Sequence, residues 1–410
     1  SLIYTSTSGS TGEPFYFSRW NRLDWESSII HELFLENGLR DHDGPTLIII
    51  GFGMGIWVGG LITYKAFEIA IQRGNYPVSI ITPGVNKAEI FNALKKLAPH
   101  YKQVILTGYA PFVKDIIDEA PRHGIDVKKL NLRLLFAAES FTEKFRDYIC
   151  KKTAIKNPCL DTLNVYGTAD IGTMAYETPV SILIRRLAVK NKNLFREIFS
   201  SIHKMPTLTQ YNPHFITFES PNKDIILTGN NAVPLIRYSV GDHGATYSFD
   251  ELAVKLKKFN LDIYKEAKKA GIQKCVYELP FVCVYERKDF GIKLHLWDVY
   301  PGFIKDIFIR KPFSAFLTGK FSIALRYDKD ANQYLEVNVE LKKDKKMNSR
   351  LEKLLCKKIV NTLHIKNLKP GQGPGGNYLL KRPNLIKLIC WPAEHPLHFK
   401  LGIKQKWVKK

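Results

Sequence analysis

Short apolar runs alternate with helix-like segments between residues 46 and 150. The runs are rich in Ile, Leu and Val, and they are short enough for strands that are buried on both faces. The strands are expected at 47–50, 78–82, 103–107 and 132–137. The intervening segments place apolar residues at helical spacing, near 60–73, 87–98, 111–120 and 141–150. Such alternation predicts an α/β fold with a parallel sheet flanked by helices.

The pattern changes further along the chain. Residues 179–202 and 250–269 each predict a single helix, the second of them so charged that it is expected on the surface, and 214–242 favours strands. After about residue 287 the pattern is typical of a small α+β domain. Its strands are expected at 291–297, 314–327 and 334–341, with helices near 302–309 and 347–363. The predicted domains are therefore a large core, 1–287, and a small C-terminal domain, 288–410.

Composition limits the class of protein. The chain has 410 residues, of which 45% are hydrophobic, so it can bury a large core. Its 61 Lys and Arg against 39 Asp and Glu give a net charge of +22, which attracts anions. No long Lys/Arg block or basic–aromatic repeat is present, so nucleic acid is not the expected partner. The six cysteines form no C-x-x-C pair, and we expect reduced thiols in a cytoplasmic protein.

An uncharged stretch from 46 to 64 approaches the roughly 20 residues that a membrane-spanning helix needs. It begins with a β-rich run and contains Gly51, Gly53, Gly55, Gly59 and Gly60. A buried strand, a glycine turn and a following helix explain this composition better, so no membrane span is expected.

A Ser/Thr/Gly-rich run lies close to the start of the chain. Glycines permit turns that aim successive backbone N–H groups inward, and hydroxyls add donors for phosphate oxygens, so the run could bind phosphates. From composition alone, a flexible linker is the alternative. The run lacks the Gly-Lys-Ser/Thr of a P-loop. Its residues are Thr7, Ser8, Gly9, Ser10, Thr11 and Gly12, followed by Glu13 and Pro14.

Six segments resemble, in the same order, motifs of the adenylate-forming superfamily of acyl-CoA synthetases and nonribosomal adenylation domains. Within it they are most similar to the phenylacetate–CoA ligase-like family. The segments are 7–14, 51–60, 136–140, 166–170, 235–242 and 287–301. They resemble the family motifs T-S-G-S/T-T-G-x-P, G-Y-G-L-F-x-G-G, G-A-E-P, Y-G-x-S/T-E, L-I-R-Y-R-T-G-D and R-x-D…V-F-P.

The resemblance implies both a fold and a reaction. The fold would be a large N-terminal domain with parallel sheets flanked by helices, followed by a small mobile α+β domain. The reaction would use ATP to convert a carboxylic acid into an acyl-adenylate with release of pyrophosphate, followed by transfer to a thiol such as coenzyme A. The implied cofactors are ATP and Mg²⁺, with coenzyme A as a possible third.

The resemblance also assigns roles to residues. The run 7–12 would hold the β- and γ-phosphates, and Thr168 would contact the α-phosphate. Asp170 would hold Mg²⁺ in place of the family's longer Glu. Asp242 would bind both ribose hydroxyls, since a carboxylate has two accepting oxygens; taken alone, it could simply belong to a turn after Gly241. The other implied nucleotide contacts are Ala137, Ala138, Glu139, Tyr166, Gly167 and Arg287.

Relatives supply a lysine from the small domain, whose cation bridges the carboxylate and the α-phosphate. The resemblance implies Lys404 as the first choice and Lys400 as the second, although a basic tail would offer a lysine in any case. Relatives rotate the small domain about the residue that matches Asp289. Their Arg-Gly pair beside the thiol tunnel corresponds here to His295 and Leu296. The acceptor therefore stays open: coenzyme A, a carrier-protein thiol, a protein cysteine or an amine.

Three further expectations follow from the comparison with the family. The chain begins shortly before Thr7, so it is expected to be a fragment or one piece of a longer protein, without the family's N-terminal segment. Trp57 and Tyr109, with Ala137, could line a pocket for an aromatic or fatty acid. The charged segment 243–286 is longer than the family's link and is expected to be a surface helix.

A non-catalytic nucleotide-binding relative is the main alternative function, and a basic nucleic-acid or membrane-surface protein is a weaker one.

Overall fold

A computed structural model gives the fold. It describes residues 2–6, 15–39, 44–55, 58–199, 206–230, 232–285, 291–295, 297–329, 332–367, 385–400 and 406–409. The chain forms two compact units and passes from the first to the second between residues 286 and 287. Each unit is described by itself below.

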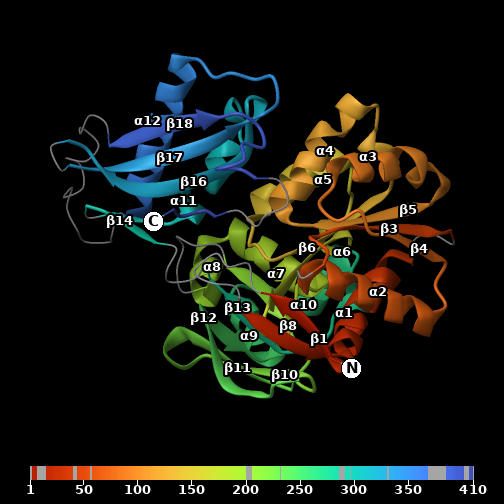
Figure 1. Cartoon of the computed structure of the whole chain (residues 1–410). Helices are drawn as coiled ribbons and strands as arrows, with labels where there is room; N and C mark the ends of the chain where they lie inside the picture. Colours follow the sequence, from red (N-terminus) through yellow and green to blue (C-terminus); the bar gives the residue numbers. More distant parts are fainter. Residues whose placement is uncertain are drawn as a thin grey trace. The chain divides into compact units, whose positions relative to one another are not determined.

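A mixed sheet of 11 strands organises the first unit, in the order β10-β11-β12-β13-β9-β8-β7-β6-β5-β3-β4 (Figure 1). The half from β4 to β7 is parallel, which confirms the four predicted strands; β3, β5 and β6 are buried, whereas β4 lies at the edge of the sheet and is only partly buried. The half from β7 to β10 is antiparallel and was not predicted as part of the same sheet. The strands are β3 (Thr46–Gly51), β4 (Val78–Ile81), β5 (Gln103–Gly108), β6 (Leu132–Ala137), β7 (Thr162–Thr168), β8 (Gly172–Tyr176), β9 (Thr207–Gln210), β10 (Ile216–Glu219), β11 (Asp224–Gly229), β12 (Leu235–Tyr247) and β13 (Phe281–Val284).

Helices cover the parallel half of this sheet on both faces, with α3, α4 and α5 on one face and α1 and α2 on the other (Figure 1). β3 and β5 are therefore buried on both sides, as at Ile48 and Ile105, which are fully buried. Asn86 caps α3 by accepting from the backbone N–H of Glu89, which confirms the predicted helix start. These helices are α1 (Asn21–Leu39), α2 (Val58–Gly74), α3 (Lys87–Lys96), α4 (Ala110–Glu119), α5 (Glu143–Thr153) and the short α6 (Pro158–Asp161).

The glycine-rich stretch after β3 leads into α2, so residues 46–64 are a strand, a turn and a helix as predicted. Within the described parts of the chain, every helix is too short or too polar to cross a lipid bilayer. All six cysteines are free thiols, and four of them are buried.

Two segments that were predicted as single helices are each a pair of helices. The backbone at Asn191 is extended, and its side chain accepts from the N–H groups of Asn193 and Leu194, so one helix ends and a new one begins there. Asn260 has a φ of 58°, which a continuing helix does not allow, and Asp262 caps the next helix. The four helices are α7 (Pro179–Lys190), α8 (Lys192–Phe199), α9 (Phe249–Lys257) and α10 (Ile263–Lys269).

The segment 243–286 is more than a surface helix. It supplies β13, whose four residues Phe281–Val284 are buried between β12 and β9 in the large sheet. The face of α9 that carries Phe249, Leu252 and Leu256 is also buried. Because its strand is central, this segment is part of the core of the first unit.

An antiparallel hairpin of β1 (Leu2–Ser6) and β2 (Tyr16–Trp20) precedes α1. Ser6 pairs with Tyr16, so the strands approach each other at the end where residues 7–14 join them. The two strands of one hairpin therefore come directly before and after the predicted phosphate loop in the sequence.

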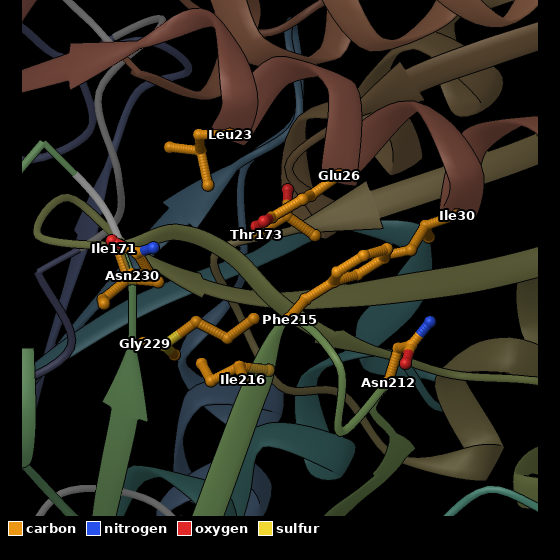
Figure 2. A pocket seen from close by; sticks show the side chains of 11 residues that line it. Leu23, Glu26, Ile30, Ile171, Thr173, Asn212, Phe215, Ile216, Gly229 and Asn230 are labelled. Atoms are coloured by element: carbon orange, nitrogen blue, oxygen red, sulfur yellow. The ribbon is translucent and has the colours of Figure 1, made fainter. Parts of the chain in front are cut away.

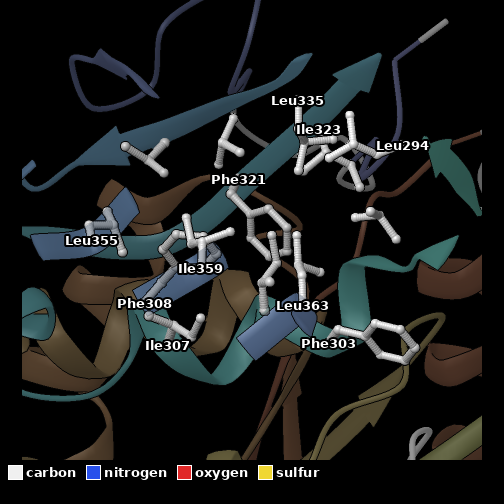
Figure 3. Packing of buried hydrophobic residues seen from close by; sticks show 14 of the residues in the cluster. Leu294, Phe303, Ile307, Phe308, Phe321, Ile323, Leu335, Leu355, Ile359 and Leu363 are labelled. Atoms are coloured by element: carbon white, nitrogen blue, oxygen red, sulfur yellow. The ribbon is translucent and has the colours of Figure 1, made fainter. Parts of the chain in front are cut away.

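The second unit is built on a three-stranded sheet in the order β16-β17-β18. One face of this sheet packs on two helices, and Figure 3 shows Phe321 among Phe308, Ile359 and Leu363 in that core. The predicted strand 291–297 is a short hairpin of two strands, because His295 adopts a left-handed backbone with a φ of 53°. The elements are β14 (Ile292–Leu294), β15 (Trp297–Val299), α11 (Pro301–Phe308), β16 (Leu317–Tyr327), β17 (Gln333–Leu341), α12 (Ser349–Asn367) and β18 (Ile386–Trp391).

Candidate functional site

The β7–β8 hairpin carries several of the predicted site residues on a tight turn. A Cβ atom on Gly167 would lie 2.4 Å from the carbonyl oxygen of Gly172, so the two strands can approach this closely only because residue 167 is glycine. Gly172 itself has a φ of 88°, which favours glycine. The turn at 169–171 therefore places Asp170 at the tip of the hairpin, next to Thr168.

The second contributor is β12, which changes its partner along its length. Its first part pairs with β11 and its last part, from Gly244, with β13. Two left-handed residues lie in the first part, Arg237 with a φ of 49° and Gly241 with a φ of 77°. The N–H of Arg237 donates to the Thr228 hydroxyl at 3.0 Å, which stabilises the irregular backbone just before Tyr238.

Two tyrosine–carboxylate pairs connect these two segments. The Tyr166 hydroxyl donates to Oδ2 of Asp242 at 2.7 Å, and the Tyr238 hydroxyl donates to Oδ2 of Asp170 at 2.6 Å. Each segment thus contributes one tyrosine and one aspartate. The predicted ribose-binding residue and the predicted metal ligand are brought into one site, although they are far apart in the sequence.

The chain bends sharply after β6, at the predicted adenine-site residues. Ala138 has a φ of 69°, an unusual conformation for a residue other than glycine, and it is exposed, whereas Glu139 is buried. The side-chain amide of Asn164 donates to the carbonyl oxygen of Glu139 at 3.1 Å, which stabilises the bend.

Asn164 was not identified from the sequence. It is 3% exposed, and its side-chain oxygen has no hydrogen-bond partner among the described residues. It lies two residues before Tyr166 on β7, so the two side chains point to the same face. An asparagine between Leu163 and Val165, two residues before the tyrosine, was the available signal.

A buried ionic cluster lies beneath this part of the site. Glu177 accepts from both Arg146 and Arg185, at 2.8 Å each, and also from the backbone N–H of Asn164 at 3.1 Å. Burial disfavours the charged form of Arg146, yet its carboxylate neighbours, Glu143 foremost, outweigh this effect and raise its pKa. The Arg146 guanidinium therefore stays charged, and the cluster fixes the start of β7 to α5 and α7.

Tyr109 lies close to the glycine-rich stretch, as predicted for a pocket residue. Its ring packs edge-on against Phe52, with centroids 5.4 Å apart. Burial raises the pKa of the Tyr109 hydroxyl, and the negative charge of Glu139 adds to this shift. The structure therefore groups Tyr109 and Glu139, while Trp57 lies outside the described residues.

A pocket lies beside the β7–β8 hairpin (Figure 2). Leu23, Glu26 and Ile30 of α1 form one wall, and the remaining lining comes from β8, β10, the end of β11 and the loop between β9 and β10. Ile171, which directly follows Asp170 in the chain, and Thr173 also line it. Tyr109, Ala137 and Asp242 are not among its lining residues.

Several predicted site residues are not described by the structure. They are Thr7, Ser8, Gly9, Ser10, Thr11, Gly12, Trp57, Arg287, Asp289 and Lys404. Lys400 is described and is exposed in the second unit. His295 is also described, and its backbone N–H donates to Gln333 at 2.9 Å.

The surroundings of Asp170 fit one mode of magnesium binding. In the described parts of the chain, no three His, Cys, Asp or Glu side chains gather as a metal site would require. Magnesium in nucleotide-binding proteins is often bound through one or two carboxylates, with phosphate oxygens and water completing its shell. A single carboxylate at the tip of a hairpin fits that arrangement, and a metal site built from protein ligands alone does not.

Comparison with known proteins gives the fold a name. No protein-family model and no characterised protein sequence matches the chain. A solved structure of 2-hydroxyisobutyryl-CoA ligase in the postadenylation state with R3-HIB-AMP aligns over 99% of this chain and 73% of that one, with a TM-score of 0.61 and 13% identity. The chain has the fold of adenylate-forming ligases.

Other solved structures agree with this adenylate-forming fold. The same ligase in complex with 2-HIB-AMP aligns with a TM-score of 0.61 at 12% identity, over 99% of this chain and 73% of that one. An ATP-bound RpMatB-BxBclM chimera, B1, aligns with a TM-score of 0.52 at 12% identity, over 94% of this chain and 64% of that one. At these identities the comparison establishes the fold, and it confirms the α/β architecture predicted from the motifs.

Proposed function

We propose that this protein uses ATP to activate a carboxylic acid as an acyl-adenylate, with release of pyrophosphate. The observation that carries the proposal is the pair of contacts Tyr166–Asp242 and Tyr238–Asp170, which joins two motif segments in an adenylate-forming fold. Acyl transfer to the α-phosphorus requires aligned reactants and stabilisation of negative charge. The proposed residues supply hydrogen-bond acceptors for the nucleotide and a carboxylate for a cation.

In this proposal the nucleotide lies between the bend at 137–139 and β12. Asp242 accepts from the ribose hydroxyls, and the Tyr166 ring lies against the adenine. Asn164 is added to the set, because its buried side-chain oxygen can accept from the adenine amino group. Thr168 donates to the α-phosphate, and Asp170 binds Mg²⁺, which when present offsets phosphate charge. Lys404, or Lys400, supplies the cation from the second unit, and residues 7–12 hold the other phosphates.

The acceptor of the acyl group is proposed to be a thiol, with coenzyme A as the first candidate. Two of the aligned structures support this choice, since they are of a CoA ligase. The positions that match the family's Arg-Gly pair are His295 and Leu296, so a protein thiol, a carrier-protein thiol or an amine is the alternative. Arg287 and Asp289 would complete the nucleotide site and the hinge. A cytoplasmic location and membership of the phenylacetate–CoA ligase-like family also stay predictions.

The acid is proposed to be aromatic or fatty. The support is the apolar surrounding of Tyr109, whose ring packs on Phe52. Trp57 would extend this pocket. Pockets with mostly apolar lining and few polar groups favour such substrates.

The test is acid-dependent exchange of labelled pyrophosphate into ATP, measured against a library of carboxylic acids. Asp242→Ala should reduce the exchange at least about 100-fold, since it removes the acceptor for the ribose. Asp250→Ala is the matched control, because Asp250 lies exposed in the first turn of α9 and should leave the exchange unchanged. Full exchange in Asp242→Ala would contradict the ribose-binding role.

A non-catalytic nucleotide-binding protein is the second candidate. It is favoured by the shorter Asp170 in place of the family's Glu and by Ile403 in place of the lysine after glycine. This alternative predicts ATP binding by calorimetry with no exchange for any acid in the library.

A further inference from the structure

The second tyrosine–aspartate pair involves a residue to which no role has yet been given. We propose that Tyr238 is a positioning residue that fixes Asp170 for binding the metal–nucleotide complex. This inference rests on the proposed function, because it assigns a task to Tyr238 within that same site. The resemblance to the family's motifs includes Tyr238 in the segment 235–242 but assigns it no role.

Asp170 needs such a partner because of where it lies. It is the middle residue of the turn at 169–171, at the tip of the β7–β8 hairpin, and it is only partly buried. Its neighbours in the turn contribute no side chain that could fix its carboxylate, since Ala169 and Ile171 are apolar. A side chain in this position can occupy several rotamers, and holding one of them costs conformational entropy.

Tyr238 is well placed to hold one rotamer. Its ring packs on an apolar cluster that includes Ile171 and Leu227, so the ring itself is held by the core. Its hydroxyl then donates to Oδ2 of Asp170 at 2.6 Å, within the usual range for a charge-assisted hydrogen bond from a hydroxyl to a carboxylate. The donor thus fixes one carboxylate oxygen and orients the other.

The reciprocal pair supports the same conclusion. The Tyr166 ring packs on the same apolar cluster, and its hydroxyl donates to Asp242. The two pairs run in opposite directions between β7 and β12, so each segment orients the carboxylate of the other. A shift of β12 relative to the hairpin would disturb both Asp170 and Asp242. Removing the Tyr238 hydroxyl leaves the Tyr166–Asp242 contact in place, so nucleotide binding at Asp242 is expected to persist while metal binding at Asp170 weakens.

The experiment measures ATP binding by titration calorimetry with and without Mg²⁺, in the full chain. The variants are Tyr238→Phe, Asp170→Asn and the double variant. Tyr264→Phe is the matched control, because Tyr264 donates to Glu278 at 2.6 Å in the same kind of pair, on the exposed part of α10. Binding of Mn²⁺ with ATP, observed by paramagnetic resonance, gives a second readout that does not depend on turnover.

Tyr238→Phe should leave the affinity for metal-free ATP within about twofold, while the gain in affinity on adding Mg²⁺ should fall roughly 10-fold, as is typical when a partner of a metal ligand is lost. Asp170→Asn should lose the same gain, and the double variant should lose little more than either single one. The Tyr264→Phe control should behave like the unmodified chain. Phenylalanine conserves the ring, and thermal unfolding of each variant verifies that it is folded.

Two outcomes would overturn the inference and separate it from the proposed function. If Tyr238→Phe keeps the full metal-dependent gain while Asp170→Asn loses it, then Tyr238 has no positioning role and the proposed function stands. If the unmodified chain binds no ATP with or without metal, the proposed function fails, and the role of Tyr238 fails with it.

Discussion

The two units of this protein differ in where their positively charged side chains lie and in whether these side chains form ion pairs. Residues 287–410 contain 27 Lys and Arg against 10 Asp and Glu, so this part carries +17 of the net charge of +22. In the first unit, Arg146 and Arg185 are fully buried and paired with Glu143 and Glu177. In the second unit, the outer face of α12 carries exposed cations that form no ion pair with a described residue. They are Arg350, Lys353, Lys357 and Lys358.

This difference shows what each kind of charge can do. A buried pair fixes the relative position of the elements that carry it, because separating its members leaves a charge without solvent. An exposed cation on a helix affects its neighbours only weakly and is screened by salt. The candidate site lies over the buried cluster, where Glu177 bonds the backbone of Asn164. The positive face of α12 instead contributes an attraction for anions.

The largest expected effect comes from breaking the buried cluster. Arg146→Met should lower the free energy of unfolding by about 3–5 kcal/mol, because it leaves Glu143 and Glu177 buried with one cation fewer. Lys357→Met makes the same chemical change on the exposed face of α12 and should alter stability by less than about 0.5 kcal/mol. Denaturant unfolding of both variants measures the contrast. Equal effects of the two substitutions on stability would contradict the view that buried ion pairs stabilise the first unit more than exposed cations affect the second.

A second prediction concerns what stabilises the second unit in place of buried ion pairs. Phe321 is fully buried in its apolar core, with its ring centroid 4.5 Å from that of Phe308 (Figure 3). Phe321→Ala should cost about 3–4 kcal/mol of unfolding free energy through lost burial and a remaining cavity. Tyr327→Ala, at the exposed end of the same strand, is the control and should cost less than about 1 kcal/mol. A small effect at Phe321 would mean that this core is loosely packed.

The sequence predicted the apolar strands β3 to β6 and a strand-rich region at 214–242, which holds β10, β11 and most of β12, but it missed β7, β8, β9 and β13. Strands buried on both faces between helices are continuous apolar runs, and such runs are visible locally. β9 consists of Thr207, Leu208, Thr209 and Gln210, and its buried polar groups are satisfied by distant partners such as the carbonyl oxygen of Val282. No local pattern shows those partners.

The candidate site divides in the same way. Motif order was enough to select Tyr166, Asp170 and Asp242, and the structure brings these three together with Tyr238. The pairing itself joins residues about 70 positions apart and requires the bends at Arg237 and Gly241. Asn164 was missed because its importance lies in contacts with Glu139 and Glu177, which are far from it in the sequence. The breaks at Asn191 and Asn260 could have been predicted, since asparagine often caps helices and adopts left-handed backbone.

The pH dependence of stability gives a prediction of intermediate size for the first unit. His31 is fully buried between α1 and α2, and burial lowers its pKa from 6.5 to about 4. As pH falls, the unfolded chain protonates its histidine at a higher pH than the folded chain protonates His31. The stabilisation from neutral His31 is therefore present in full above pH 6.5 and decreases as the pH falls to about 4. The loss should reach about 3 kcal/mol.

Replacing His31 tests this assignment. Unfolding free energies of His31→Gln, measured from pH 7.5 to 4.5, should fall less steeply with acid than those of the unmodified chain. His214→Gln is the control, because His214 is exposed and its replacement should leave the slope unchanged. Parallel pH profiles for the unmodified chain and His31→Gln would show that another group causes the acid sensitivity.

The smallest expected effect tests whether the cations on α12 repel one another. Lys353 and Lys357 lie one turn apart on the exposed face of the helix, and like charges at this spacing destabilise it. Lys353→Glu would place an acidic residue four positions before Lys357, which is the favourable orientation, and should raise the unfolding free energy by about 0.5 kcal/mol at low salt. Because exposed charges are screened, the gain should disappear near 1 M salt. A gain that persists at high salt would point to helix propensity or packing instead of charge, and α12 would then differ from the buried cluster by more than its exposure.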